Sequence, residues 1–296
     1  MRIAITGANA GIGLRAVEGL TARGHQVVAL CRDLDRAAAA FASIPAEHRG
    51  RIEMVEADLS SFSSIRAATQ RVNGAGPLDA LINNAAVFDQ SNRTARTSVD
   101  GHELFWATNH LGPTLLTALL SPALAAAPDP RVLFVASKGL ITMPRIGIRF
   151  GELDDPSWFT PTAAYYHSKL AQVMTAVTLA ERIGDLLDVS CLRVPAVRLD
   201  ADRLAAQPTL LRLLYQPKNR AAAAPEMIAD VYADLITGPA RHSRGAEAYV
   251  DEKSRVVSLP RFARDSEQRD RLWALTQAAI GDPQWTWEQV NPPVAG

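Results

Sequence analysis

The chain has 296 residues with 31 basic and 31 acidic side chains, so its net charge at neutral pH is zero. This balance, without a long run of like charge, excludes the usual electrostatic signature of proteins that bind nucleic acids or anionic membranes, and we expect neither partner. The length suits one or two domains, and the lack of a linker-like segment favours a single unit over residues 1–296.

Two cysteines, Cys31 and Cys191, lie far apart in apolar, strand-like runs, which predicts buried thiols in a reducing compartment. A first strand is predicted at residues 2–6, so we expect no signal peptide and a cytoplasmic protein. Residues 111–127 carry no charge, but these 17 residues fall short of the ~20 that a membrane span needs and include Gly112, Pro113 and Pro122. A buried helix is predicted there instead.

Short runs rich in β-branched residues alternate with helical patterns along the chain. They predict strands at residues 2–6, 26–30, 51–55, 78–82, 131–136, 189–193 and 246–250. Long crossovers imply a parallel sheet, and right-handed crossovers then give an α/β fold, a Rossmann-type doubly wound sheet of about seven parallel strands with helices on both faces. In such a sheet a ligand crevice opens at the carboxyl ends of the strands.

A glycine-rich turn follows the first predicted strand and opens a helix whose apolar residues recur at helical spacing. Glycines in this place let backbone N–H groups approach a pyrophosphate, and the helix N-terminus adds partial positive charge. A glycine turn alone also suits an ordinary tight turn that needs a positive φ angle. Its position between strand and helix predicts a dinucleotide site that includes Gly7, Asn9, Gly11, Ile12 and Gly13.

The residues after the second and third strands bear on the adenosine half of such a cofactor. A NAD site usually has a carboxylate after the second strand, but this chain has Arg32, and a guanidinium suits a 2′-phosphate. We therefore predict NADP(H) in preference to NAD(H), with the adjacent Asp33 as a helix N-cap. Asp58, after the third strand, is either a contact for the adenine amino group or a cap for the helix that begins near Ser61.

The helix predicted at residues 163–183 carries Tyr165 and Lys169, which share a face because they are four residues apart. A cation within ~4–6 Å lowers the pKa of an acid by roughly 1–3 units, so we expect the Lys169 ammonium to lower the pKa of the Tyr165 phenol and make it a usable proton donor. The alternative is an amphipathic helix with this common spacing. Tyr166, three residues from Lys169, is not excluded by spacing alone.

Residues 195–225 have weak periodicity and several prolines, which predicts a mobile insertion over the crevice rather than a second domain. The helix at residues 163–183 is apolar on more than one face, which allows a homodimer or homotetramer. The histidines show no paired metal spacing, so no metal site is expected. A lipophilic substrate is favoured by apolar residues that either rim the crevice or pack the insertion, namely Phe88, Met143, Trp158, Phe159, Leu213, Leu214 and Tyr215.

Together these motifs resemble those of the short-chain dehydrogenase/reductase family over nearly the whole chain. The resemblance implies coenzyme binding by the glycine turn, an adenine contact at Asp58 and Leu59, and a sheet-stabilising segment that includes Asn84. It implies that Ser137 holds the substrate oxygen, Lys169 binds the nicotinamide ribose and Asn109 holds a water. Ser137 could instead simply end its strand, and Asn109 could bond inside its helix. The implied catalytic residues are Asn109, Ser137, Tyr165 and Lys169, and the last two also contact the cofactor.

The 28 positions from Ser137 to Tyr165 and the phrase Tyr-His-Ser-Lys-Leu-Ala resemble the retinol dehydrogenase and protochlorophyllide reductase branch. That branch generally uses NADP(H) and lipophilic carbonyls or alcohols. One departure lies after the sixth predicted strand, where the family commonly has Pro-Gly followed by a threonine. Here Pro195 precedes Ala196, and the family's backbone contact to the nicotinamide falls at this Pro195.

The resulting expectation is an NADP(H)-dependent oxidoreductase that interconverts a lipophilic or aromatic carbonyl and its alcohol. Two alternatives stay open. The same scaffold can serve a non-redox enzyme, such as a cyclase, epimerase or dehydratase on a natural-product intermediate, and the altered Pro195 segment motivates that alternative. The chain could also be a cofactor-sensing regulatory protein, although the four catalytic residue types argue against a dormant site.

Overall fold

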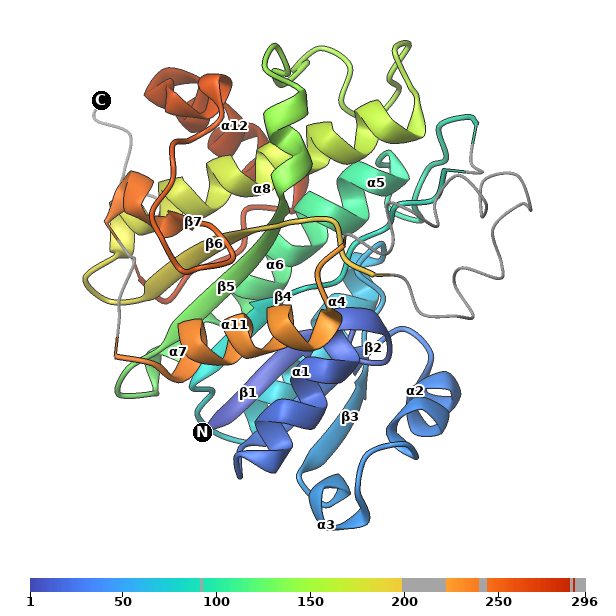
Figure 1. The fold of residues 1–296 in the computed structure, drawn as a ribbon. Coiled ribbons are helices and arrows are strands. Elements are labelled where there is room, and N and C mark those ends of the chain that lie inside the picture. Colours follow the sequence, from blue (N-terminus) through green and yellow to red (C-terminus); the bar gives the residue numbers. More distant parts are fainter. Residues whose placement is uncertain (91–92, 199–221, 240–243, 288–289, 291–296) are drawn as a thin grey trace.

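The computed structural model describes the chain except for residues 91–92, 199–221, 240–243, 288–289 and 291–296. Its strands are β1 (Arg2–Thr6), β2 (Gln26–Cys31), β3 (Ile52–Glu56), β4 (Ala80–Asn83), β5 (Arg131–Ser137), β6 (Asp188–Val194) and β7 (Tyr249–Val250). Within the described residues these strands form one parallel seven-stranded sheet in the order β3-β2-β1-β4-β5-β6-β7 (Figure 1). The chain reverses its direction of travel across the sheet between β1 and β4, which confirms the predicted doubly wound fold.

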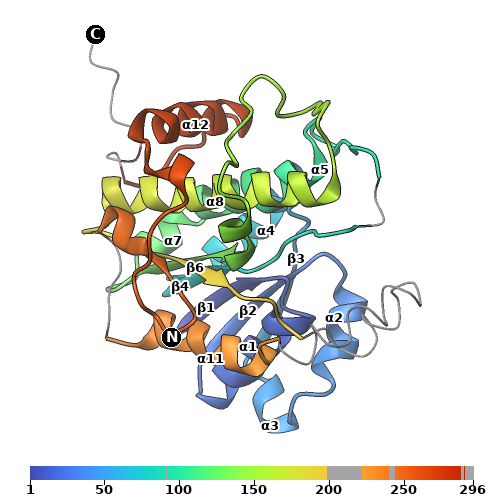
Figure 2. The ribbon, with the colours of Figure 1, turned by 45° about the horizontal axis from the view of Figure 1, so that its top comes forward.

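Helices cover both faces of the sheet (Figure 2). One face carries α1 (Gly11–Ala22) and α11 (Pro225–Thr237), and the other carries α4 (Phe62–Gly74), α6 (Gly112–Leu119) and α8 (Pro161–Ile183). Successive residues of a strand point to opposite faces of the sheet, and each face has its own hydrophobic core. Ile3 and Ile5 therefore pack in the core beside α1, whereas Ala4 packs in the core on the α8 side. Because both faces are covered, the central strands β1, β4 and β5 are mostly apolar. Shorter or outlying helices are α2 (Leu34–Phe41), α3 (Ala46–Arg49), α5 (Leu104–Trp106), α7 (Ser121–Ala125) and α12 (Ser266–Ala279).

Two elements differ from the sequence-based expectation. The seventh strand starts only at Tyr249, because the residues before it form a 3₁₀ turn, Gly245–Ala248, that Gly245 opens with a φ of 54°. The predicted helix over residues 111–127 is divided into a π-helical turn, Ala107–Leu111, followed by α6 and α7. Pro113 and Pro122 each lie in the first turn of a helix, where a missing N–H breaks no intrahelical bond.

Helix α8 is buried on more than one side because it lies between the sheet and α12 (Figure 1). The Arg182 guanidinium lies 5.1 Å from the centre of the Trp273 ring of α12, and Arg269 pairs with Glu181 at 2.6 Å. The second apolar face, which suggested a partner helix from another copy, is therefore covered by this chain's own α12. A homodimer or homotetramer stays a prediction without that argument.

Most of the insertion predicted at residues 195–225 lies outside the described residues, as do Leu213, Leu214 and Tyr215. Its described ends meet, because the Ala223 N–H donates to the Ala196 carbonyl and the Arg198 N–H donates to the Ala223 carbonyl, both at 2.9 Å. Among the described helices, none has the combined length and apolar character that crossing a bilayer requires.

Candidate functional site

The turn between β1 and α1 has a backbone shape that only glycine accommodates. Gly7 and Gly11 have φ angles of 64° and 53°, and a Cβ on Gly13 would lie 2.2 Å from the Gly7 carbonyl oxygen. Ala10, the N-cap of α1, offers no side-chain acceptor, and the first helical turn contains no acidic residue. The N–H groups at this helix end therefore have no side-chain cap, which leaves them suited to an anion.

Asn84 ties this turn to the end of β4. Its Nδ2 donates to the carbonyl of Thr6 at 2.8 Å, and its Oδ1 accepts the Tyr232 hydroxyl of α11 at 3.1 Å. Beneath the turn, the Cys31 thiol accepts backbone N–H groups of Ala8 and Asn9, and burial raises the pKa of this thiol to about 11. Asn84 and Cys31 thus shape the turn from below, while Asn9 and Ile12 lie half-buried within it.

Arg32 directly follows β2, and its side chain is exposed. The adjacent Asp33 caps α2 as predicted, because its Oδ1 accepts the Arg36 N–H at 2.9 Å. An arginine at the carboxyl end of β2 is thus open to solvent, while the neighbouring carboxylate is occupied by its own helix.

Asp58 is not the cap of α4, which is Ser61. Instead the Asp58 Oδ1 accepts the N–H and the hydroxyl of Ser60 at 2.9 and 2.6 Å. Leu59 is only 5 % exposed and packs in the core, with its carbonyl directed at Gly112. The side chain of Asp58 therefore lies at the sheet edge, whereas only the backbone of Leu59 could contact a ligand.

Ser137 and Tyr165 come together at the carboxyl end of β5. The Tyr165 hydroxyl is hydrogen-bonded to the Ser137 side chain, and the Ser137 Oγ also accepts the Gly139 N–H at 3.2 Å. Burial raises the pKa of Tyr165 to about 12, Tyr166 adds to this rise, and the hydrogen bond with Ser137 opposes it. The phenol is therefore protonated at neutral pH and is held beside a second hydroxyl.

Lys169 lies one helical turn after Tyr165, with its Nζ 5.9 Å from the centre of the Tyr165 ring. This buried ammonium donates to the Val135 carbonyl at 2.6 Å and to the Gln172 Oε1 at 2.9 Å. Burial lowers the pKa of Lys169 to about 8, and Cys191, a buried thiol as predicted, opposes that shift. The expected lowering of the Tyr165 pKa by Lys169 is wrong, because the ammonium is directed at the sheet and burial of the phenol dominates.

Asn109 lies in the π-helical turn before α6. Its Oδ1 accepts the Val87 N–H at 2.7 Å, and its Nδ2 donates to the Val87 carbonyl and to the Ser168 hydroxyl, both at 3.0 Å. The side chain therefore links the loop after β4 to α8 rather than bonding inside its own helix. Pro113 has no N–H to offer the Asn109 carbonyl four residues earlier, so that carbonyl has no α-helical donor.

Two aromatic rings flank Tyr165. The ring of Phe88, 43 % exposed, lies with its centre 4.3 Å from that of Tyr165 and covers the phenol from the loop after β4. Tyr166 packs over Gly139, where an added Cβ would lie 2.1 Å from the Tyr166 hydroxyl. The hydrogen bond with Ser137 thus groups Tyr165 with the other candidate catalytic residues, and Tyr166 forms the neighbouring wall.

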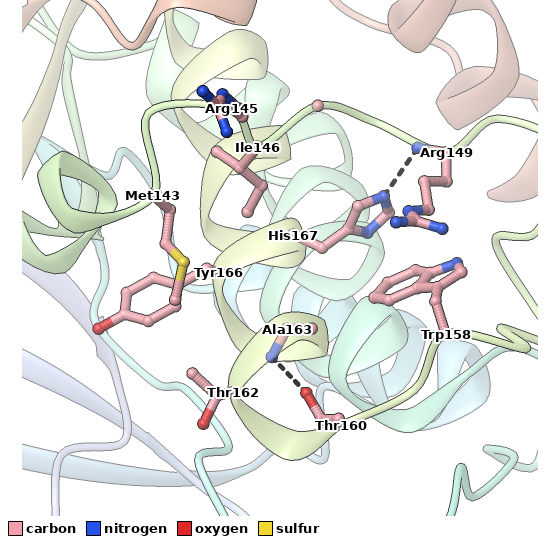
Figure 3. Close-up of a pocket in the computed structure, with 11 residues that line it drawn as sticks. Met143, Arg145, Ile146, Arg149, Trp158, Thr160, Thr162, Ala163, Tyr166 and His167 are labelled. Carbon is pink, nitrogen blue, oxygen red and sulfur yellow. Dashed lines mark hydrogen bonds between the residues drawn. The ribbon is translucent and has the colours of Figure 1, made fainter.

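A cavity of about 320 Å³ lies against the first turns of α8 (Figure 3). Tyr166 and His167 of α8 form one side, and the segments before α8 form the others. Of the residues expected to rim the crevice, Met143 and Trp158 line this cavity, whereas Phe159 packs edge-on against Phe105 at 6.0 Å. The candidate site thus combines the Ser137–Tyr165 pair with an adjacent hollow.

Two histidines are buried in this region, and one of them, His167, lines the cavity. The His167 Nε2 accepts the Arg149 N–H at 3.1 Å, and its ring lies between Trp106 and Trp158, with ring centres 5.0 and 4.8 Å away. His110 lies on the other side of Trp106 at 4.4 Å. Burial is the main cause that lowers the pKa of His167 to about 4 and that of His110 to about 3. Both rings are therefore neutral near pH 7.

We expect these histidines to make the fold sensitive to acid. An unfolded histidine titrates near ~6.5, so below that pH the unfolded chain binds protons that the folded chain excludes. The two groups contribute fully only well above pH ~6.5, and together they lose about 3 kcal/mol of unfolding free energy between pH ~6.5 and ~5. Denaturant unfolding at both pH values measures the loss. His167→Gln should show about half of it, and an unchanged pH dependence in this variant would contradict the assignment.

Sequence patterns did not single out Gln172 or the structural role of Cys31. Gln172 lies three residues after Lys169, a spacing that places both on one helix face and could have flagged it. Its Oε1 binds the ammonium, and its buried Nε2 has no partner among the described residues. Cys31 carried no such signal, because its position under the turn depends on how β1 and β2 pair.

Comparison with known proteins gives consistent similarities. Residues 1–147 match the short chain dehydrogenase family. Human retinol dehydrogenase 14 is 30% identical over 297 residues, with 94% of this chain and 86% of that protein covered. The chloroplastic protochlorophyllide reductase of Chlamydomonas reinhardtii is 36% identical over 210 residues, with 63% and 52% covered. A solved structure of an uncharacterized protein from Mycobacterium Paratuberculosis has a TM-score of 0.69 at 26% identity, covering 97% of this chain and 95% of that one.

Proposed function

The chain belongs to the short-chain dehydrogenase family and is an oxidoreductase of that family, and from this we propose that it uses NADP(H) to interconvert a lipophilic or aromatic carbonyl compound and its alcohol. One observation carries the proposal. A protonated phenol, Tyr165, is hydrogen-bonded to Ser137 at the carboxyl edge of the sheet, with the buried ammonium of Lys169 one helical turn away. That combination suits proton transfer to or from an alcohol oxygen.

The glycine turn fits the phosphates of a dinucleotide, because Gly13 leaves no room for a Cβ and the start of α1 has no side-chain cap. When bound, the nicotinamide supplies or accepts the hydride. The Oδ1 of Asp58 is engaged by Ser60, so its Oδ2 would accept the adenine amino group. The residues that would hold the cofactor are Gly7, Asn9, Gly11, Ile12, Gly13, Arg32, Asp58, Leu59, Asn84, Tyr165, Lys169 and Pro195, with Asn84 acting through the turn that it fixes.

The chain's own residues would move the proton. Ser137 would donate a hydrogen bond to the substrate oxygen and stabilise negative charge on it, while Tyr165 gives or takes the proton. With a pKa near 8, Lys169 is mostly charged at pH 7 and can release the Val135 carbonyl to bind ribose hydroxyls instead. Asn109 would hold a water at its carbonyl and so connect Lys169 to solvent.

Replacement of Arg32 tests the proposed preference for NADP(H) over NAD(H). We expect Arg32→Ala to weaken NADPH binding about tenfold, because an exposed arginine–phosphate contact contributes roughly 1–2 kcal/mol. The affinity for NADH, which lacks the 2′-phosphate, should change little and serves as the internal control. Fluorescence titration of both cofactors measures this, and an equal loss for both would show that Arg32 does not read the phosphate.

A substrate panel tests the function itself. Purified protein is incubated with NADPH or NADH and a set of lipophilic and aromatic aldehydes and ketones, and the cofactor absorbance at 340 nm is followed. We expect turnover of several compounds with NADPH at higher kcat/KM than with NADH. Product formation without cofactor consumption would instead favour a non-redox activity, and the absence of any turnover across the panel would count against the proposal.

A further inference from the structure

The cavity beside Tyr166 has one apolar wall and one basic wall. Side chains of Met143, Ile146 and Trp158 surround it together with the Tyr166 ring (Figure 3). His167 adds no charge, because its Nε2 accepts a backbone N–H and burial keeps its pKa near 4. These surfaces suit the lipophilic part of a small molecule, and about 320 Å³ falls within the usual range of ligand pockets.

Arg145 and Arg149 supply the basic wall. Both side chains are exposed, both line the cavity, and neither has an ion pair within the described part of the chain. The carboxylate of Glu152 interacts with the charge of Arg149, but it accepts its hydrogen bonds from the N–H and the hydroxyl of Ser157. Two arginines thus line one hollow, and neither forms an ion pair among the described residues.

Of these two arginines, Arg149 is also held in place. The backbone N–H of Arg149 donates to His167 of α8, and its guanidinium lies 5.3 Å from the centre of the Trp158 ring. Stacking on an aromatic ring leaves the edge of a guanidinium free to bind an anion. A ligand with a carboxylate or another anionic group would therefore meet a donor whose position is already restricted.

The cavity adjoins the reacting residues. The ring centre of Tyr166, which forms a cavity wall, lies 5.3 Å from that of Tyr165. Met143, which also lines the cavity, follows Ser137 by six residues, across the 3₁₀ helix Lys138–Thr142. A molecule whose carbonyl oxygen lies between Ser137 and Tyr165 would therefore have to pass only the Tyr166 side chain to reach the cavity.

We infer that this cavity binds the distal part of the substrate and that the preferred substrates are lipophilic carbonyl compounds that carry an anionic group, which Arg145 and Arg149 recognise. This inference rests on the proposed carbonyl chemistry and narrows its substrate class. It assigns the apolar wall to the body of the molecule and the two arginines to its charged end. It predicts that a free acid is a better substrate than the neutral ester of the same length.

The test compares aromatic aldehydes that carry a terminal carboxylate on alkyl chains of increasing length with their methyl esters. At the best length, we expect the acid to exceed its ester about tenfold in kcat/KM, mainly through KM, as a charge-assisted contact predicts. The double variant Arg145→Gln/Arg149→Gln should lose most of this acid preference, and high salt should reduce it. Arg49→Gln, an exposed arginine of α3 at the far end of the molecule, should keep it (Figure 1).

The outcomes separate this inference from the proposed function. If the native protein reduces the esters but shows no preference for the acids, the substrate inference is overturned while the carbonyl chemistry stands. The same holds if the double variant retains the full preference. If neither acids nor esters consume NADPH, the proposed function fails together with this inference. Equal melting temperatures of the native and double-variant proteins exclude misfolding as the cause of a loss.

Discussion

Tyr165→Phe is expected to lower kcat by about 10³-fold while leaving NADPH affinity nearly unchanged. General acid catalysis by a positioned side chain contributes typically 10²–10⁴-fold, and only the phenol oxygen is removed. The ring stays, so the contact with Phe88 and the burial in α8 are retained. Steady-state kinetics with a panel substrate measures the loss, and fluorescence titration measures the retained binding.

Tyr166→Phe is the matched comparison for this prediction. The two tyrosines are adjacent, but the hydrogen bond with Ser137 belongs to Tyr165, while Tyr166 packs over Gly139. The Tyr166 variant should therefore lose far less turnover, and its change should fall on KM, because it lines the cavity. Similar kcat values for the native protein and Tyr165→Phe, or a larger loss in Tyr166→Phe, would contradict the assignment.

Gly13→Ala is expected to raise the dissociation constant of NADPH by about 100-fold or more. The added methyl group would lie 2.2 Å from the Gly7 carbonyl oxygen and 2.8 Å from the Asn84 Nδ2. The nearest of these atoms belongs to the backbone, so the turn itself must open, and such overpacking costs roughly 1–3 kcal/mol of stability as well. Titration with NADPH and thermal unfolding measure the two effects.

Gly19→Ala provides the control within the same helix. No atom outside the local helix lies within 4 Å of a Cβ at this position. Alanine is favoured over glycine in a helix by about 1 kcal/mol, so this variant should bind NADPH normally and melt at the same temperature or slightly higher. Weakened NADPH binding in both variants would show that the loss does not come from the turn.

The fold was largely predictable because parallel strands buried on both faces are continuous apolar runs. The predicted first strand, for example, has the bounds of β1. The prediction was less accurate for the start of β7. Ala246 and Ala248 extend the apolar pattern of the strand, but the same pattern is compatible with the 3₁₀ turn that the structure has there. The predicted single helix is divided into α6 and α7 because Pro113 and Pro122 each lie in the first turn of a helix. The sequence pattern alone did not show that the two prolines would start helices.

The sequence predicted which residues form the candidate site, but it did not predict which atoms their side chains contact. Helical spacing placed Tyr165 and Lys169 on one face, and the structure keeps them near each other. Spacing cannot state how deeply that face is buried, and depth directs the ammonium to Val135 and raises the pKa of the phenol. The cover that Phe88 forms over Tyr165 likewise depends on a loop from a different strand.

The cavity arises from tertiary packing that no local pattern encodes. In the sequence, nothing distinguishes Arg145 and Arg149 from other arginines in loops. Their role depends on the position of Trp158 and on the hydrogen bond between the Arg149 backbone and His167. Those contacts bring residues before and within α8 together, and they exist only once the loop has folded onto the helix.

Transfer of deuterium from NADPH labelled at C4 of the nicotinamide is the decisive measurement of the proposed hydride transfer. With the hydride-donating face labelled, we expect one deuterium at the carbinol carbon of the alcohol for each NADPH consumed, detected by mass spectrometry, and almost no labelled product from Tyr165→Phe. Product that forms without deuterium, or labelled product that forms as fast in Tyr165→Phe, would contradict it.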